Sequence, residues 1–284
     1  MEQHQTLKLI LRTDELPTLP TVVHQILGVT GDPSSSTRQL TELIERDPSL
    51  SANLLKLVNS AYFGFSRTIS QVHDAAVLVG YSTIRTLALS TSVISAFDTG
   101  QGLDARAFWE HSISTAIAAG TVARTLGHEQ NDLAFMAGLL HDIGVLIFAL
   151  RFPDAPEGLY DGDLHDLLTR EEAVFGMNHA VAGGFVARHW KFEPELTRAI
   201  EEHHLPSGAA PESVGSLARL VRLAEWLASD RYPLDGPGVG TDDDMSAVAD
   251  SLGYDMDALV GLGPVLEREY RTVDALMAVD TQGP

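Results

Sequence analysis

The sequence contains no cysteine, which excludes disulfide bonds and thiolate metal ligands. The N-terminus lacks the apolar region of a signal peptide, and no apolar run reaches the roughly 18 residues that a membrane span needs. Basic residues are scarce: 19 Lys and Arg face 39 Asp and Glu, and the basic residues form no cluster. A net charge of −20 repels nucleic acids and anionic membranes. We therefore expect a cytoplasmic protein that binds neither.

Signals for β-strands are also missing. No segment alternates apolar and polar residues with period two, and no Asn-Gly or Asp-Gly pair joins two β-rich runs. Apolar residues recur instead at helical spacing between Pro, Gly and capping residues. The sequence therefore predicts an all-α protein. Helices are expected near residues 1–15, 21–29, 38–45, 48–58, 70–79, 83–97, 104–126, 131–150, 163–175, 179–190, 194–204 and 211–229, with two short helices at the end.

Individual residues mark where these helices begin and end. Asp47 followed by Pro48 is typical of an N-cap and a first helical position. Thr37 and Ser82 are further expected N-caps, and Gly80 and Gly127 are expected stops, as is usual for glycine.

A break in the helical pattern at residues 98–102, which read Asp-Thr-Gly-Gln-Gly, separates two helical lobes. We predict a two-lobed helical protein, with an N-terminal lobe at 1–99 and a C-terminal lobe with an extension at 100–284. Residues 232–244, acidic and rich in Gly and Pro, are expected to form an exposed loop.

The dipeptide His-Asp occurs three times, at 73–74, 141–142 and 165–166, but its surroundings differ. Residues 134–140, just before His141 and Asp142, are almost wholly apolar, so this pair is expected to be buried. A buried carboxylate needs a cation, a metal or several hydrogen bonds as a partner. The question is whether other segments supply further metal ligands.

Other imidazoles and a carboxylate lie near the ends or within the helices of the second lobe: His111, His179, His203, His204 and Glu225. Such nitrogen and oxygen donors suit Zn, Fe, Ni or Mn, and a carboxylate flanked by histidines can hold two ions close together. The alternative that these histidines bind no metal stays open, because a lone histidine on an apolar helix is more often a hydrogen-bonded core residue. The pair His203-His204 is also compatible with a solvated helix terminus.

Several motifs in the first lobe resemble the HDOD family, the HD-related output domains of bacterial signalling proteins. They are Leu-Pro-Thr-Leu-Pro at 16–20, Asp-Pro-Ser-Leu at 47–50, Leu-Val-Asn-Ser-Ala-Tyr-Phe-Gly at 57–64 and Val-Gly at 79–80. The resemblance covers about residues 10–230. It implies an all-helical fold whose second lobe is an HD-domain-like helical bundle, related to HD-type metal phosphohydrolases.

The second lobe also resembles the HD-GYP phosphodiesterases. Their ligand pattern is a His, a His-Asp, a His four residues before Gly, a His-His and a late Asp. The resemblance implies a divalent metal site of one or two ions, with Glu225 in place of the late Asp. One ion would be held by His111, His141, Asp142 and Glu225, and the other by Asp142, His179, His203 and His204.

Three departures from that pattern argue against turnover. Val145 stands where the hydrolases usually carry Lys, the Gly-Tyr-Pro loop after His-His is replaced by Leu-Pro-Ser at 205–207, and Glu225 is one methylene longer than Asp. Loss of the Lys removes charge stabilisation in the transition state. No catalytic residue is therefore assigned from the sequence.

Two functions remain under consideration. The one we favour is a non-catalytic regulatory output module with a retained metal pocket, which signals to a partner such as a sensor kinase or a response regulator. The alternative is a metal-dependent phosphohydrolase or phosphodiesterase acting on a nucleotide or cyclic nucleotide. Either could bind a small phosphate-containing ligand. A start so close to the Leu-Pro motif is compatible with a fragment of a longer regulator that carries a receiver domain.

Overall fold

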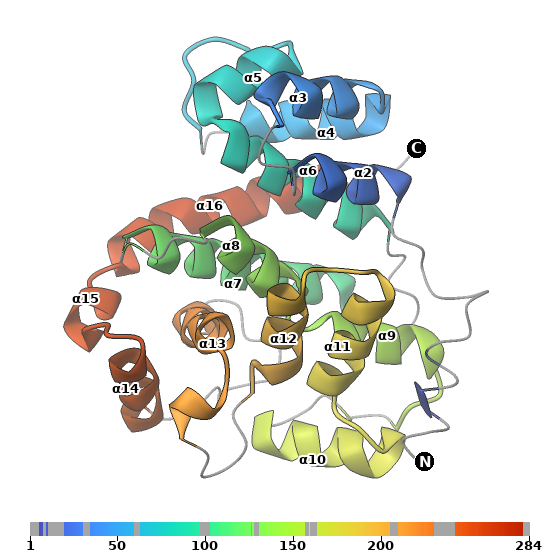
Figure 1. Cartoon of the computed structure of the whole chain (residues 1–284), viewed down its shortest axis with the longest axis vertical. Helices are drawn as coiled ribbons and strands as arrows, with labels where there is room; N and C mark the ends of the chain where they lie inside the picture. The colour runs from blue at the N-terminus through green and yellow to red at the C-terminus, as the bar shows by residue number, and fades with distance from the viewer. Residues whose placement is uncertain are drawn as a thin grey trace. The chain divides into compact units, whose positions relative to one another are not determined.

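The computed structural model describes residues 6–7, 10, 20–30, 35–59, 63–96, 103–125, 127, 131–156, 159, 164–204, 210–229 and 242–280. Its regular elements, across these residues, are helices, and no strand occurs among them (Figure 1). The predicted all-α class is confirmed. The expected helix at 1–15 and the expected loop at 232–244 lie largely outside the described residues.

The chain divides into two compact units, and each is made from more than one segment. One unit comprises residues 1–16 and 99–266, and the other comprises residues 17–98 and 267–284. The domain boundaries expected from the sequence, 1–99 and 100–284, stay a prediction.

The smaller unit is built from short amphipathic helices: α2 (Thr21–Thr30), α3 (Thr37–Glu45), α4 (Pro48–Val58), α5 (Val72–Val79) and α6 (Tyr81–Ala96). Helix α3 packs on α2, α4 and α5, and α6 packs on α2, α4 and α5. Leu40, Ile44 and Leu54 are fully buried between these helices. Burial of each such side chain contributes about 2 kcal/mol.

The expected helix boundaries hold at some positions and shift at others. The Asp47 carboxylate accepts hydrogen bonds from the backbone of Ser49 and Leu50, and Gly80 and Gly127 have positive φ angles of 90° and 75°. The expected cap at Thr37 was wrong by one residue, because Ser36 forms the capping box with Gln39. Ser82 lies inside α6 and is not its N-cap.

The motif residue Asn59 follows α4 and closes the loop that leads to α5. Its side-chain amide donates to the carbonyl of Ile69 at 2.7 Å, and its side-chain oxygen accepts from the Ile69 N–H at 2.7 Å. This pair of bonds satisfies both polar groups of a buried residue's backbone. Asn59, one residue of the motif that resembles the HDOD family, thus has a structural role: its side chain holds the loop between α4 and α5 in place.

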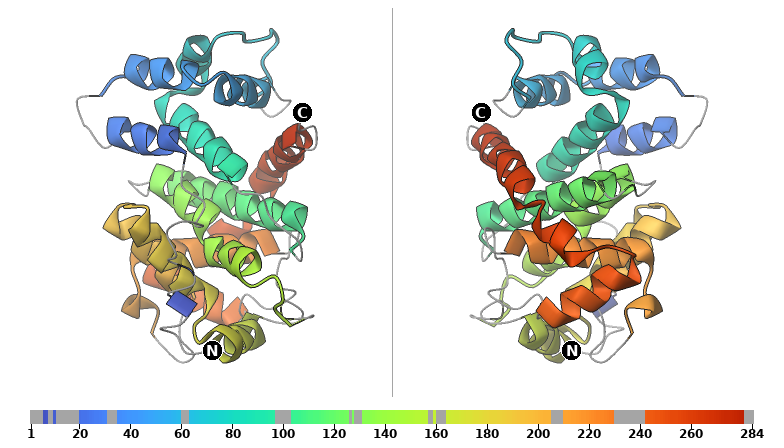
Figure 2. Two further views of the ribbon diagram at one scale, coloured as in Figure 1. Left: turned by 90° about the vertical axis from the view of Figure 1, so that its right-hand side faces the viewer. Right: turned by 90° about the vertical axis from the view of Figure 1, so that its left-hand side faces the viewer.

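Within the described residues, the larger unit contains α7 (Ala105–Thr125), α8 (Asn131–Leu140), α9 (Ile143–Arg151), α10 (Leu164–Phe175), α11 (His179–His189), α12 (Pro194–Glu202), the 3-10 helix η1 (Pro211–Ser213), α13 (Ser216–Ser229), α14 (Asp242–Ser251) and α15 (Met256–Val260). Helix α7 lies against α8 and α13, and α11 lies against α9 and α12 (Figure 2). The last helix, α16 (Gly263–Asp280), begins in this unit and ends in the other.

Two expectations for this part of the chain were wrong. Pro211 begins a 3-10 turn, and the α-helix starts only at Ser216. The C-terminal region holds three helices, of which α16 is 18 residues long, and not two short ones.

The stretch Leu133–Arg151 corrects the expectation that no apolar run is long enough to span a membrane. By length and composition alone its 19 residues pass that test, but 83% of the tested window is buried inside the protein. A turn at His141 and Asp142 also divides the stretch into α8 and α9. Its apolar character is that of a core helix pair.

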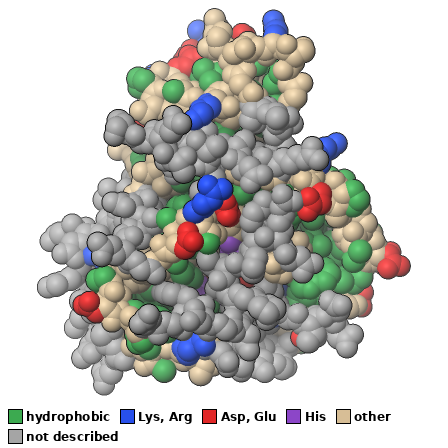
Figure 3. Space-filling view, turned by 180° about the vertical axis from the view of Figure 1, so that it is seen from behind, with side chains coloured by type: hydrophobic (Ala, Val, Ile, Leu, Met, Phe, Trp, Pro, Cys, Tyr) green, Lys and Arg blue, Asp and Glu red, His purple; other side chains and the backbone are tan. Residues whose placement is uncertain are grey.

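Lys and Arg side chains lie apart from one another on the face shown in Figure 3. In the described parts of the chain, some basic side chains are paired with acids, such as Arg38 with Glu42 and Arg188 with Glu201. This agrees with the scattered basic residues of the sequence.

Candidate metal centre

Helices α7 and α8 approach closely enough to bring His111 beside His141, and Gly138 permits that approach. A Cβ atom at position 138 would lie 2.8 Å from the Ala116 Cα atom and 2.9 Å from the Thr115 carbonyl oxygen. Those distances are far inside van der Waals contact. As a result, the Nε2 atoms of His111 and His141 lie 3.2 Å apart.

A second glycine brings in the next histidine. Gly144 lies in the first turn of α9, and a Cβ atom there would lie 2.0 Å from the His179 carbonyl oxygen and 2.9 Å from the Gly183 nitrogen. Helices α9 and α11 therefore touch backbone to backbone. This contact holds His179, the first residue of α11, next to Asp142, which directly precedes α9.

The pair His203-His204 follows the last turn of α12, which packs on α11 and α8. Gly184 allows the close contact between α11 and α12, because a Cβ atom there would meet the Glu201 side chain at 2.7 Å. An ion pair between Arg188 and Glu201 spans the same two helices at 2.5 Å.

Asp142 lies at the centre of the five imidazoles and presents one oxygen to each side. Its Oδ2 atom is 3.1 Å from the Nε2 of His141 and 3.4 Å from that of His111. Its Oδ1 atom is 3.3 Å from the Nε2 of His179 and 3.5 Å from that of His203. The Nε2 atoms of His179 and His204 are 2.8 Å apart. All these side chains are buried except that of His204, which is partly exposed.

The other ring nitrogens determine where the protons are. The Nδ1 atom of His141 bonds the Gly138 carbonyl at 2.8 Å, and that of His203 bonds the Ile200 carbonyl at 2.7 Å. A carbonyl can only accept, so both Nδ1 atoms carry a proton. In the neutral ring the Nε2 atom is then a bare lone pair, and in both residues it points at a carboxylate oxygen.

Bare nitrogens around a carboxylate repel it unless a cation or protons lie between them. Both carboxylate oxygens of Asp142 and the Nε2 atom of His203 are buried without a hydrogen-bond partner among the described residues. Buried polar atoms are rarely left in that state. Donors bound about 2.1 Å from one ion lie about 3.0 Å apart in an octahedron and about 3.4 Å apart in a tetrahedron. The observed separations of 2.8–3.5 Å fit that spacing, so the residues fit a divalent metal.

The structure brings six of the seven expected ligands together in two sets. One set is His111, His141 and Asp142, and the other is Asp142, His179, His203 and His204; within each set the ligand atoms lie within 4.8 Å of one another. This is the division implied by the HD-GYP resemblance. Glu225 is buried in α13, and its Oε2 atom has no hydrogen-bond partner in the described part of the chain. It belongs to neither set, so its role as a ligand stays a prediction.

One buried carboxylate beside these ligands, that of Glu171, was not expected from the sequence. Glu171 accepts hydrogen bonds through Oε2 from the His179 N–H at 2.8 Å and from the His179 ring Nδ1 at 2.7 Å. A signal was present: Leu167, Glu171 and Phe175 recur every four residues, and all three are buried. A carboxylate on the apolar stripe of a helix requires a partner in the core.

The sequence profile of the HDOD domain matches residues 16–206, more than half of the chain. The chain belongs to the HDOD family. The resemblance of its second half to HD-GYP phosphodiesterases rests on the ligand pattern and stays a resemblance.

Two curated proteins resemble this HDOD chain over different shares of its length. An uncharacterized protein of Treponema pallidum is 27% identical over 232 residues, which is 78% of this chain and 44% of that relative. The chain thus spans less than half the length of this curated relative. Ribonuclease Y of Parafrankia is 31% identical over 114 residues, which is 39% of this chain and 20% of that enzyme.

Solved structures share the fold. A candidate phosphohydrolase of Shewanella amazonensis is 28% identical, with a TM-score of 0.74 over 94% of this chain and 97% of that one. A candidate signal transduction protein of Marinobacter aquaeolei is 23% identical, with a TM-score of 0.80 over 99% of this chain and 66% of that one. The second of these likenesses concerns the fold alone.

The charges at the centre of this HDOD protein shift its titrating groups in opposite directions. Burial opposes the ionised form of Asp142, but the imidazoles outweigh it and hold the pKa of the carboxyl well below its usual value. Burial also opposes the charged form of His179, yet Glu171 and Asp142 raise its pKa well above the usual value. Burial lowers the pKa of His203, and burial together with the nearby His203 and His179 lowers that of His204 well below normal.

These shifts predict how metal affinity depends on pH. His203 and His204 are neutral at about pH 7 and ready to ligate, whereas His179 retains a proton that a metal must displace. Affinity should therefore rise as the pH increases from about 7 toward the raised pKa of His179, by up to about tenfold per pH unit. Calorimetry in buffers of different ionisation enthalpy should detect about one proton released per ion. Affinity that is flat above about pH 7, with no proton release, would contradict this assignment.

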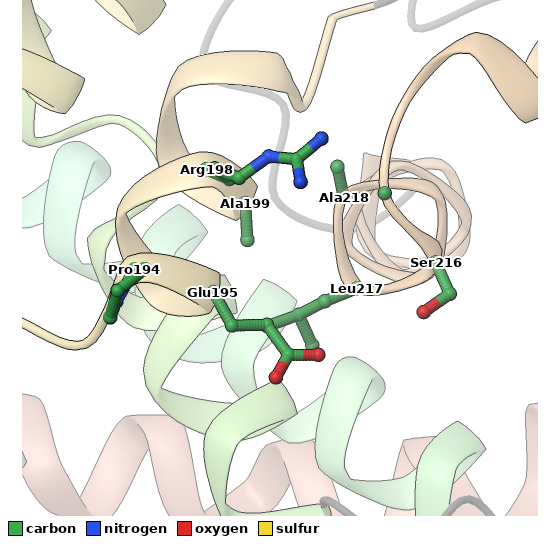
Figure 4. Close-up of a pocket in the computed structure, with 8 residues that line it drawn as sticks. Pro194, Glu195, Arg198, Ala199, Ser216, Leu217 and Ala218 are labelled. Atoms are coloured by element: carbon green, nitrogen blue, oxygen red, sulfur yellow. The ribbon is translucent and has the colours of Figure 1, made fainter.

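A separate cavity of about 340 Å³ lies between the first two turns of α12 and the start of α13, lined by Pro194, Glu195, Arg198, Ala199, Gly215, Ser216, Leu217 and Ala218 (Figure 4). The Arg198 side chain bonds Glu202 at 3.4 Å, and Glu202 also accepts from the Gly215 N–H at 3.2 Å. Glu202 thus ties the start of α13 to the end of α12, immediately before His203.

Proposed function

We propose that this HDOD chain is a regulatory output module that holds two divalent ions on Asp142 and does not hydrolyse phosphodiesters. The observation that carries the proposal is the placement of the two Asp142 oxygens. Each oxygen faces its own set of imidazole nitrogens, at 3.1–3.4 Å on one side and 3.3–3.5 Å on the other. A carboxylate that bridges two ions has this arrangement.

The donor atoms narrow the choice of metal. Five imidazoles and one carboxylate, without thiolates, suit Fe, Mn, Zn or Ni, whereas Ca²⁺ prefers oxygen ligands alone. Glu225 is proposed as a further ligand to the ion at His111 and His141. When bound, such ions neutralise charge and polarise a phosphoryl oxygen or water.

The residue after the His-Asp-x-Gly motif supports a non-catalytic role. Val145, where the hydrolases usually carry Lys, is 1% exposed and belongs to the apolar core of α9. A buried valine supplies no charge to a phosphate, and the chain lacks the stabilisation that a lysine gives in the transition state. His111, His141, His179 and His203 are likewise buried.

As an output module in the cytoplasm, the protein would act through contacts with a signalling partner such as a sensor kinase or a response regulator. The family membership motivates this part of the proposal, because HDOD domains resemble output domains of bacterial signalling proteins. A bound metal would stabilise the arrangement of α7, α8, α9, α11 and α12, because its ligands lie in these helices or directly beside their ends.

A specific observation favours a second function, that of a metal-dependent phosphohydrolase acting on a nucleotide or cyclic nucleotide. The ligand set is nearly complete, and the Shewanella relative, 28% identical, is named as a candidate phosphohydrolase. A relative named Ribonuclease Y matches over a shorter stretch.

A turnover assay separates the two functions. The Mn- or Fe-loaded protein is incubated with cyclic di-GMP and with bis(4-nitrophenyl) phosphate, beside the Asp142→Asn variant treated in the same way. The proposal expects both proteins to show the same background rate, because the cationic clamp is missing. Metal-dependent turnover by the unaltered chain that the substitution abolishes would establish the phosphohydrolase instead.

A further inference from the structure

Glu171 is an acidic residue outside the two ligand sets that contacts one of their ligands, His179. It lies in α10 and has no exposed surface. Its Oε2 atom accepts two hydrogen bonds from His179, one from the backbone N–H at 2.8 Å and one from ring Nδ1 at 2.7 Å. Its Oε1 atom has no hydrogen-bond partner among the described residues. Burial of a carboxylate costs free energy that only hydrogen bonds or a nearby positive charge offset, and the two bonds to His179 are the compensation seen here.

These two bonds fix both the position and the tautomer of His179. The backbone bond holds the first residue of α11 against α10, and the ring bond keeps the proton on Nδ1. The Nε2 atom is thereby turned toward Asp142 Oδ1, at 3.3 Å, and toward His204 Nε2, at 2.8 Å. A ligand histidine bonded through its other nitrogen is oriented for metal and becomes a stronger donor.

His179 differs from two other histidines of the centre in how its ring is supported. His141 and His203 donate through Nδ1 to the neutral main-chain carbonyls of Gly138 and Ile200. His179 donates to a carboxylate. A charge-assisted bond is shorter and stronger than a neutral one, so His179 has a more firmly held ring and an additional negative charge behind it.

We propose that Glu171 is a positioning residue for the ion held by Asp142, His179, His203 and His204. It sets the ring of His179 and adds charge that favours a divalent cation at that place, while the ion at His111 and His141 depends on it little. This inference rests on the proposed two-ion centre and deepens it, because it predicts that the two ions respond unequally to one substitution.

The test titrates metal-free protein with Co²⁺, followed by visible absorption and calorimetry, for four proteins. Glu171→Ala removes both bonds, whereas Glu171→Gln keeps an oxygen acceptor and removes the charge. The matched control is Glu172→Gln, the next residue of α10, which is exposed and bonds the Asn178 side chain at 3.0 Å. Glu172 therefore contacts the start of the same helix without touching a ligand.

Affinity for one of the two ions should fall about 10- to 100-fold in Glu171→Ala, as is usual when a group that bonds a ligand is removed. Glu171→Gln should show a smaller loss for the same ion, and Glu172→Gln should bind as the unaltered protein does. In the metal-free protein, ¹⁵N shifts of the His179 ring, at a pH where it is neutral, should show the proton on Nδ1 in the unaltered chain and a mixture in Glu171→Ala. A change confined to fold stability would leave that tautomer signal unmoved.

Equal binding of both ions by all four proteins, with an unchanged His179 tautomer, would overturn the role of Glu171 and leave the two-ion centre intact. Equal weakening of both ions would also overturn it, because the effect would not be specific to His179. If Glu171→Ala does not fold, Glu171→Gln decides by the same criterion. Failure of the unaltered protein to bind Co²⁺ would overturn the proposed centre and this inference together.

Discussion

Replacement of Asp142 by Asn is expected to remove both ions at once. The carboxylate is shared by the two ligand sets, with one oxygen directed at each. Asparagine keeps the shape, but it exchanges an oxygen for an amide NH₂ group that cannot ligate and removes the charge. Loss of a group that merely bonds a ligand lowers metal affinity about 10- to 100-fold, so loss of the bridging ligand should exceed about 100-fold for each ion.

Thermal unfolding reports this loss directly. Metal at about 100 times its dissociation constant stabilises the folded state by about 2.7 kcal/mol, so the unaltered protein should gain several degrees in melting temperature and Asp142→Asn should gain none. Asp154→Asn, an exposed carboxylate in the loop after α9, is the control for charge alone and should respond like the unaltered chain. A full metal response in Asp142→Asn would refute the bridging role.

Replacement of Gly144 by Ala is expected to disturb both the fold and the ion at His179. The new Cβ atom would lie 2.0 Å from the His179 carbonyl oxygen, and its neighbours are backbone atoms that no rotamer change can move. Helix α11 must shift away from α9, which should lower the free energy of unfolding by about 3 kcal/mol, the upper end of the usual range for overpacking. Chemical denaturation and metal titration measure the two effects.

Gly28→Ala is a control that is expected to change the free energy of unfolding in the opposite direction. Gly28 lies within α2, and apart from its chain neighbours and the backbone of its own helix no atom lies within 4 Å of the position where a Cβ would be. Alanine in a helix interior is favoured over glycine by about 0.5–1 kcal/mol, so this variant should be slightly stabilised. If Gly144→Ala were as stable as Gly28→Ala and bound metal normally, the backbone contact between α9 and α11 would not be what places His179.

Local chemistry explains which helix boundaries could be predicted. Asp47, Gly80 and Gly127 act on their own neighbours through a capping carboxylate or a positive φ angle, so the sequence was sufficient there. It failed where adjacent residues offer similar chemistry, as with Ser36 beside Thr37. The choice between the two hydroxyls had a local signal that was overlooked, because Gln39 lies three residues after Ser36 and completes its capping box, whereas Leu40 lies three residues after Thr37.

The ligand set could be predicted only in part from the residues themselves. Six of the expected ligands come from α7, α11, the turn before α9 and the end of α12, and nothing local states that these segments meet. The family resemblance supplied that pairing. The crossings at Gly138 and Gly144 supply its physical cause, which the dipeptide pattern did not reveal. Glu171 was overlooked because it bonds a ligand and matches no ligand motif.

The number of metal ions that the protein takes up, after its metal has been removed, tests the central claim most directly. Purified protein stripped with a chelator and dialysed is titrated with Mn²⁺ or Fe²⁺ under anaerobic conditions, and bound metal is measured by elemental analysis at each step. We expect saturation at two ions per chain, with one ion bound by each of the two ligand sets. No metal retained at micromolar concentrations of either ion would contradict the account, because the five imidazoles would then surround Asp142 without holding a cation.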